Sequence, residues 1–200
     1  TPGQTIPTEP GFLRGHGTYV LRGGLVASVA GVVHRVNKLV SVVPLKARYG
    51  GQIGDVVVGR IVDVGQKRWR VDINANQYAI LMLSSVDLPG DVQRRRTHED
   101  QLNMRSLYAE GDLICAEVHQ FFQDGAISVH TRTSGAGRYG RLRPGVLLEV
   151  PSVLVRRMKQ HHHSLRDGSE TPIGVEVILS SNGMVWISPA TPAEGDDGMG

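Results

Sequence analysis

Basic residues cluster at four places along the chain, with a spacing typical of surfaces that hold a phosphate backbone. Proteins that bind single-stranded nucleic acid line a groove with cations and stack bases on aromatic rings or arginine planes. Such runs can equally be solvated faces, and for each cluster the residues alone leave both interpretations open. The clusters are Lys67, Arg68 and Arg70; Arg94, Arg95 and Arg96; Arg138, Arg141 and Arg143; and Arg156, Arg157 and Lys159.

Trp69 lies inside the first cluster, but its position predicts a core residue rather than a stacking platform. The run from Lys67 to Ile73 alternates between apolar and charged residues, as a half-buried strand does. Trp69 falls on the apolar face, opposite to Arg68 and Arg70. The remaining stacking candidates are Tyr78 and His130.

No recognisable pattern of catalytic or metal-binding residues is present. The sequence contains no G-x-S-x-G, H-E-x-x-H or Walker A motif. On a helix, the adjacent residues His161–His163 would point about 100° apart, so we expect a polar helix end rather than a metal site. Cys115 stands in an apolar run and is typical of a buried hydrophobic residue. We predict that the protein is not an enzyme and binds no cofactor or metal. The alternative is an active site formed by carboxylates that lie far apart in the sequence.

The segment Gly135–Gly140 matches the glycine pattern G-x-G-x-x-G of dinucleotide sites. Such a site requires a helix directly after the glycines, because the helix amides bind the pyrophosphate. Pro144 and Gly145 would instead break a helix. The pattern therefore indicates a basic flexible linker.

Composition and charge limit the classes of protein to which the chain can belong. Hydrophobic residues make up 40% of the chain and charged residues 20%, which is ordinary for a globular protein. The net charge is +3, and residues 1–50 carry six basic residues against one acid, which suggests a polyanionic partner. No stretch approaches the roughly 18 apolar residues of a membrane span, so we expect no membrane partner. Residues 1–10 lack the basic and apolar regions of a secretory signal.

Short apolar runs separated by glycines predict a mainly β fold with a small α+β part. In the middle of the chain, five strands are expected at 56–64, 67–73, 78–83, 113–118 and 126–131. A capping box at Thr97 predicts a short helix up to Tyr108. Five strands with a helix between the third and the fourth is the order of an OB-fold barrel.

The flanking segments predict two further modules. Residues 1–18 are expected to form an extended arm, and residues 19–48 a small unit of β-hairpins. Toward the C-terminus, we predict strands at 145–150, 175–179 and 184–188, and a helix from Ser152 to about Leu165. Residues 193–200 are rich in glycine and aspartate and predict a disordered acidic tail.

Several motifs, in the right order over nearly the whole chain, resemble one known family. It is the eukaryotic RNA exosome cap subunit with S1 and KH domains, known as exosome component 2 or the ribosomal RNA-processing protein 4 family. The motifs are Gly11-Phe12-Leu13-Arg14-Gly15-His16-Gly17-Thr18-Tyr19, Val36-Asn37-Lys38-Leu39, Gly54-Asp55-Val56-Val57-Val58-Gly59-Arg60, Gln66-Lys67-Arg68-Trp69, Arg94-Arg95-Arg96 and Ser128-Val129-His130-Thr131-Arg132.

The resemblance implies three modules: an N-terminal arm and β domain at 1–50, an S1-type OB domain at 51–133 and a KH-like domain at 134–192. It implies a non-catalytic subunit that stabilises a ring of RNase PH-like proteins and leads RNA into its channel, in the nucleus, the nucleolus and the cytoplasm. The partners would be single-stranded RNA, the ring subunits and the other cap subunits. The arm and β domain would make most ring contacts, and we assign these to Phe12, Arg14, His16 and Tyr19.

The chain departs from the family at two places. The family's G-x-N-G signature stands here as Ser180-Ser181-Asn182-Gly183, without its first glycine. A predicted strand follows this turn, whereas the RNA-clamping loop of a KH domain joins two helices, so we predict a structural turn. The chain also ends soon after Pro189, so we expect either an incomplete KH domain or a truncated chain.

The leading hypothesis is capture of single-stranded RNA by Lys67, Arg68, Arg70 and Arg94–Arg96, with strong salt dependence and weak sequence selectivity. An architectural role with little RNA contact is the first alternative, because residues 51–133 carry nine basic residues against eleven acids. A stand-alone nuclease is the second alternative.

Overall fold

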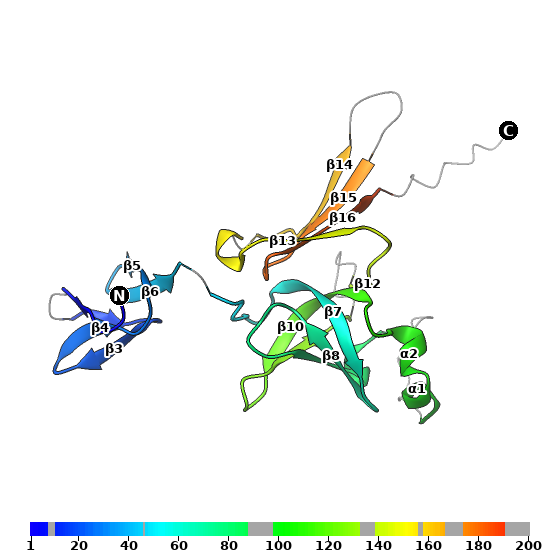
Figure 1. The fold of residues 1–200 in the computed structure, drawn as a ribbon, viewed down its shortest axis with the longest axis horizontal. Helices are drawn as coiled ribbons and strands as arrows, with labels where there is room; N and C mark the ends of the chain where they lie inside the picture. The colour runs from blue at the N-terminus through cyan, green and yellow to red at the C-terminus, as the bar shows by residue number, and fades with distance from the viewer. Residues whose placement is uncertain are drawn as a thin grey trace. The chain divides into compact units, whose positions relative to one another are not determined.

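The chain folds into two compact units, Thr1–Ala47 and Arg48–Gly200, in a computed structural model (Figure 1). The structure describes residues 1–7, 11–45, 47–87, 98–132, 139–155, 158–166 and 174–190. Within them, no helix is long and apolar enough to cross a membrane.

The first unit consists of two three-stranded sheets. β1 (Thr5–Ile6), β4 (Gly24–Ala27) and β3 (Thr18–Leu21) form one sheet; β2 (Leu13–Arg14), β6 (Leu39–Pro44) and β5 (Gly31–Val36) form the other. The turn between β3 and β4 is tight because Arg22 and Gly23 both have positive φ, the conformation that two-residue hairpins favour. Buried aliphatic side chains hold the sheets together: Ile6, Leu25, Ala27, Val40 and Val42.

The second unit begins with a closed five-stranded barrel, as the alternation of residues predicts. Its strands are β7 (Val56–Val64), β8 (Arg68–Asp72), β9 (Ala79–Met82), β10 (Leu113–Phe121) and β11 (Ile127–His130). Neighbouring strands are antiparallel except β9 and β11, and the pairing of β10 with both β7 and β11 closes the ring. The 3-10 turn η1 (Leu83–Ser85) and two short helices, α1 (His98–Leu102) and α2 (Met104–Leu107), lie between β9 and β10. This is the predicted OB-fold order.

Trp69 is the largest fully buried side chain of the barrel, which confirms its assignment to the core. The indole Nε1 donates a 2.9 Å hydrogen bond to the carbonyl oxygen of Tyr108, and the two rings meet edge to face at 5.4 Å. Tyr108 follows α2, so Trp69 ties β8 to the helical segment. Inward-facing residues of every barrel strand complete this core.

At Gly59, the backbone of β7 lies close to side chains of Val71 and Ile73. The bulge of β7 lies further along the strand, between Ile61 and Asp63. A Cβ on Gly59 would stand 2.6 Å from Val71 Cγ1 and 2.8 Å from Ile73 Cγ2. We expect Gly59→Ala to lower the free energy of unfolding by about 1–3 kcal/mol, the usual cost of overpacking a core. Urea unfolding would measure it; an unchanged midpoint would contradict this packing.

A second, four-stranded sheet follows the barrel, in the order β13 (Val146–Glu149), β16 (Met184–Pro189), β15 (Gly174–Leu179) and β14 (His162–Arg166). We call it the C-terminal sheet. The short strand β12 (Gly140–Arg141) pairs with β10 and leads the chain from the barrel to this sheet. All pairs in the C-terminal sheet are antiparallel.

The predicted helix from Ser152 to Leu165 is wrong. Among the described residues of this range, the only helical element is the 3-10 turn η2 (Ser152–Leu154), and the backbone is extended at Val155. His162–Arg166 instead form β14, which pairs with β15 at five positions, so strand pairing overrides the local N-terminal helix signal. His161–His163 therefore do not form a helix end: the Nδ1–H of buried His161 donates to the carbonyl oxygen of Leu179 at 2.7 Å.

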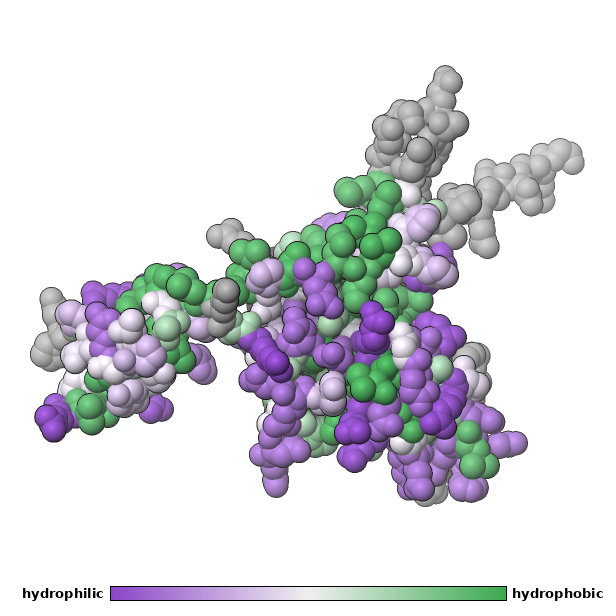
Figure 2. All heavy atoms as spheres, in the orientation of Figure 1, coloured by the Kyte–Doolittle hydropathy of each residue, from purple (hydrophilic) through white to green (hydrophobic). Residues whose placement is uncertain are grey.

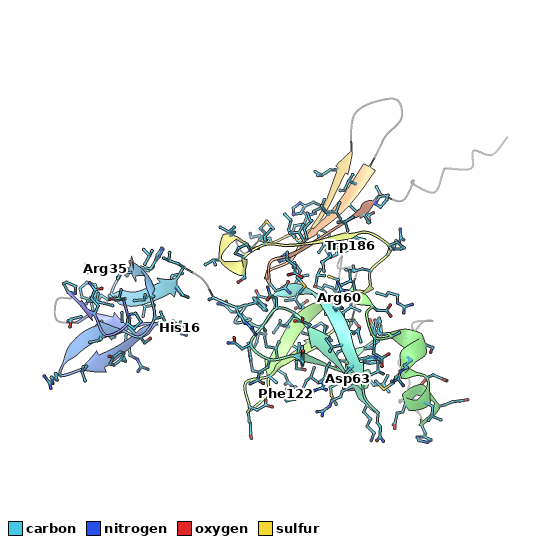
Figure 3. All side chains as sticks on the ribbon, viewed as in Figure 1. His16, Arg35, Arg60, Asp63, Phe122 and Trp186 are labelled. Atoms are coloured by element: carbon cyan, nitrogen blue, oxygen red, sulfur yellow. The ribbon has the colours of Figure 1, made fainter. Side chains whose placement is uncertain are left out.

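The C-terminal sheet packs on the outside of β7 and β10. Val56, Val58 and Cys115 from the barrel meet Ile178, Met184 and Trp186 from the sheet in one buried cluster. In Figure 3, Trp186 lies on the side of the sheet that faces the barrel. Hydrophobic residues dominate the visible face of the sheet in Figure 2, and hydrophilic residues dominate that of the barrel.

Candidate nucleic-acid interface

The outer face of β8 presents the first basic cluster. Since Trp69 and Val71 point into the barrel, the alternation of the strand exposes Arg68 and Arg70 on the opposite face. Lys67 is exposed immediately before the strand. The structure therefore exposes all three basic residues, with Arg68 and Arg70 on one face of β8 and Lys67 next to the start of the strand.

Arg70 lies between an acid and an aromatic ring. Its Nε donates to Asp63 Oδ2 at 3.1 Å, and its guanidinium carbon stands 5.9 Å from the centre of the Tyr78 ring. Tyr78 is 46% exposed, so its ring is available to a ligand. A guanidinium beside an exposed ring combines a phosphate donor with a base-stacking surface. Tyr78 is a stacking candidate from the sequence, but its place beside Arg70 could not be predicted, because the two residues lie in different segments.

The other predicted residues lie elsewhere. Arg94–Arg96 and Thr97 fall outside the described residues, as do Arg138, Arg156, Arg157 and the acidic tail. In the first unit, Arg14, His16 and Tyr19 are exposed and Phe12 is half-buried. Arg35 approaches the Phe12 ring at 6.0 Å and donates a 2.7 Å hydrogen bond to the Pro7 carbonyl oxygen.

Three rings form a row that could not be predicted from the sequence: His119 in β10, His130 in β11 and Tyr139 directly before β12. His119 and His130 meet edge to face at 5.6 Å, and His130 and Tyr139 at 6.2 Å. The Tyr139 hydroxyl donates a 2.7 Å hydrogen bond to Glu117 Oε2. Burial, together with this carboxylate, raises the pKa of Tyr139 well above its usual range. We call His119, His130 and Tyr139 the aromatic row.

The lowered pKa of His130 predicts that the stability of the barrel depends on pH. Burial lowers its pKa below 6.5; Glu117 and Asp87 oppose this, while His119 and Arg132 reinforce it. Because the unfolded chain binds the proton more tightly, stability is full above about pH 6.5 and falls as pH decreases toward the lowered pKa.

We expect His130→Gln to reduce the decrease in melting temperature between pH 7.5 and 5.5. Thermal melts of the wild type and of the variant at about pH 7.5 and about pH 5.5 would measure this difference. Equal decreases in both proteins would show that His130 contributes nothing to the pH dependence.

The turn Ser180–Gly183 joins the C-terminal sheet to the barrel. The pairing of β7 with β8 ends at Arg60 and Asp72, and the buried side-chain amide of Asn182 lies just beyond it. Asn182 Nδ2 donates to the carbonyl oxygens of Val58 at 2.7 Å and Ile73 at 2.9 Å, and Oδ1 accepts from the Val58 amide at 3.4 Å.

Backbone and hydroxyl contacts complete this junction. The amide of Ser181 donates to the Val56 carbonyl oxygen at 2.8 Å, so the turn runs beside β7. The Ser180 hydroxyl lies within hydrogen-bonding reach of Asn182 Oδ1 and the Met184 carbonyl oxygen. Gly183 has a φ of 85°, and a Cβ there would collide with the Val150 carbonyl oxygen. The predicted structural role of the turn is therefore consistent with its geometry.

Nothing in the described part of the chain resembles a metal centre, since it contains no group of three or more potential metal ligands. Cys115 is fully buried, and burial raises the pKa of its thiol to about 12. A thiol that stays protonated is a poor nucleophile.

A closed five-stranded OB barrel with an exposed cationic strand defines a class of nucleic-acid-binding protein. Family models match three segments: the RRP4 S1 domain at residues 48–120, the N-terminal region of the exosome complex exonuclease RRP4 at 1–36, and a KH domain at 145–193.

Curated relatives extend this match. The chain is 54% identical over 188 residues to exosome complex component rrp4 of Schizosaccharomyces pombe, covering 94% of this chain and 54% of that protein. It is 52% identical over 199 residues to RRP4 of Mus musculus, covering 100% and 64%. It is 30% identical over 187 residues to Rrp4 of Thermococcus kodakarensis, covering 94% and 70%.

The chain belongs to the RRP4 family of exosome complex components. It spans about half to two thirds of the length of the eukaryotic relatives given above. The sequence-based assignment to this family, and to a mainly β fold with an S1-type barrel and a KH domain, is confirmed.

Proposed function

We propose that the protein is a non-catalytic RNA-binding cap subunit of an RNA exosome, which stabilises the ring and guides single-stranded RNA into its channel for 3′–5′ processing and decay. The observation that carries this proposal is the cationic face of β8, where Arg68 and Arg70 are exposed, Lys67 is exposed just before the strand, and Arg70 lies beside the Tyr78 ring. Phosphates bind the cations and bases stack on the ring, so binding needs no particular sequence. The relatives' names and RNA-binding domains support the same assignment.

The partners we propose are the RNase PH-like ring subunits and the other cap subunits, contacted mainly through the first unit. That unit exposes large apolar side chains at β3 and β5, including Val20, Leu21, Val32 and Val33. Apolar side chains in such number are typical of a surface that another protein covers. We further propose that the protein acts in the nucleus, the nucleolus and the cytoplasm.

A purely architectural subunit is the second candidate. Asp63 neutralises part of the charge of Arg70, and Asp112 that of Arg141, which reduces the cationic surface offered to RNA. This candidate predicts that the isolated chain assembles with ring subunits but leaves RNA unbound.

The test is a filter-binding assay of the 200-residue chain with single-stranded RNA at low and moderate salt, with a parallel cleavage assay in Mg²⁺ and in EDTA. We expect salt-sensitive binding and intact RNA. Binding without salt dependence would contradict the phosphate-based site, and Mg²⁺-dependent cleavage would contradict the non-catalytic role. No binding by a folded chain would favour the architectural subunit.

A further inference from the structure

A groove of about 530 Å³ lies between the segment around β12 and the C-terminal sheet. Arg141 and Arg143 line it from the β12 side, and Trp186, Glu176 and His163 line it from the sheet. Its volume falls in the range of about 300–1,000 Å³ that is usual for ligand sites. We call it the junction groove.

Trp186 gives the junction groove an unsatisfied donor. Its side chain is only 3% exposed, and its indole Nε1 has no acceptor among the described residues. His163 Nε2 is likewise buried without a partner in that part of the chain. Buried indole N–H groups normally find an acceptor, because leaving one unpaired costs the full desolvation penalty. The lining residues of the groove therefore include two ring nitrogens without a partner among the described residues, and since the indole N–H of Trp186 can only donate, the groove favours an acceptor-rich ligand.

Two guanidinium groups make a phosphate the best match, even though Asp112 offsets part of the charge of Arg141 and Glu176 adds a carboxylate to the lining. Arg141 is fixed by Asp112, which accepts from its Nε at 3.1 Å. Partial burial raises the pKa of Asp112, but its hydrogen bonds from Arg141 and the Ala109 amide outweigh burial, so the pKa is lowered and the carboxylate stays ionised. Arg143 brings a second guanidinium to the same wall. Guanidinium groups bind phosphate through paired, charge-assisted hydrogen bonds.

The aromatic row leads to this groove. Tyr139 belongs to both: its ring meets His130, which meets the exposed His119, and Tyr139 also lines the groove. Successive aromatic rings that end at guanidinium groups are typical of a path for single-stranded nucleic acid, where bases stack and phosphates pair with cations. A peptide would not require this row.

We propose that the junction groove and the aromatic row bind single-stranded RNA as a second site, which extends the contact beyond the β8 face. The inference rests on the proposed function, because it extends the path of the same ligand. RNA long enough to reach both surfaces would bind more tightly than RNA that covers the β8 face alone.

The test compares oligouridylates of about 6 and about 14 nucleotides, which bracket much of the range that one OB fold covers. One variant is Arg143→Gln, at an exposed arginine. The other is Trp186→Phe, which removes the indole donor but retains a ring. Arg22→Gln, at the β3–β4 turn, is the matched control, and thermal melting verifies folding. We expect each groove variant to lose about 3- to 10-fold in affinity for the longer RNA, the effect of one hydrogen bond or phosphate contact, and less than about 2-fold for the shorter.

Photocrosslinking with 4-thiouridine-substituted RNA of the longer length provides an independent measurement on the wild-type chain. Adducts at Tyr139, His163 or Trp186 would support the inference. Unchanged affinities in both groove variants, with adducts confined to β8, would overturn it and leave the groove to a protein partner, while the proposed function would stand. The opposite result is also distinguishable. If the groove variants lose affinity and a variant with alanine at Lys67, Arg68 and Arg70 retains it, the inference would stand and the β8 site would fail.

Discussion

Replacing Asn182 with alanine is expected to lower the free energy of unfolding of the Arg48–Gly200 unit by about 2–5 kcal/mol. The substitution removes the donor to the carbonyl oxygens of Val58 and Ile73 and leaves both buried between the barrel and the C-terminal sheet. Each buried group without a partner costs about 1–3 kcal/mol. Urea unfolding followed by tryptophan fluorescence measures the loss, since Trp69 and Trp186 lie in the two parts that Asn182 joins.

Ser181→Ala is the matched control in the same turn. The Ser181 hydroxyl is buried without a partner among the described residues, and its backbone bond to Val56 does not need the side chain. We expect the free energy of unfolding of Ser181→Ala to differ from that of the wild type by no more than about 0.5 kcal/mol, because the substitution breaks no hydrogen bond among the described residues. Equal losses in Asn182→Ala and Ser181→Ala would contradict the role given to the amide.

Replacing Lys67, Arg68 and Arg70 together with alanine is expected to have the largest effect on RNA binding. If each cation contacts one phosphate, the slope of log affinity against log salt falls in magnitude by about 2, at roughly 0.7 per contact for single strands. Affinity at physiological salt would fall about 10- to 100-fold. Filter binding across a salt series measures both quantities.

The control removes the same number of exposed cations away from β8: Arg22, Lys38 and Arg48. For this variant, we expect the slope of log affinity against log salt to differ from the wild-type slope by less than the effect of about one phosphate contact. If both triple variants weaken binding equally, the interaction follows net charge and no specific face is involved. Unchanged binding in the β8 variant would remove the basis of the proposed site.

The barrel could be predicted from sequence because its information is local. Strict alternation around Trp69 indicates a strand with one buried face, and the helix signal after residue 97 places the crossover of an OB fold. Arg68 and Arg70 follow from the same alternation, and Lys67 was found with them because it directly precedes the strand.

The parts that could not be predicted depend on contacts through space. His162–Arg166 carry no strong strand pattern and become a strand only by pairing with β15. Likewise, the aromatic row draws His119, His130 and Tyr139 from three segments, and no spacing along the chain indicates their proximity. Asn182 could be recognised as part of a turn signature, but its partners Val58 and Ile73 lie more than a hundred residues away.

The most direct test of RNA binding by the barrel is an amide chemical-shift titration of the isotope-labelled chain with a single-stranded oligonucleotide. The β8 site predicts that the largest shifts occur at Arg68 and Arg70, at Asp63 on β7 and at Tyr78, and that added salt reverses them. Figure 3 marks the position of Asp63 on β7. Shifts confined to Thr1–Ala47, or RNA binding that leaves β8 unperturbed, would contradict the assignment of this strand as the RNA-binding surface.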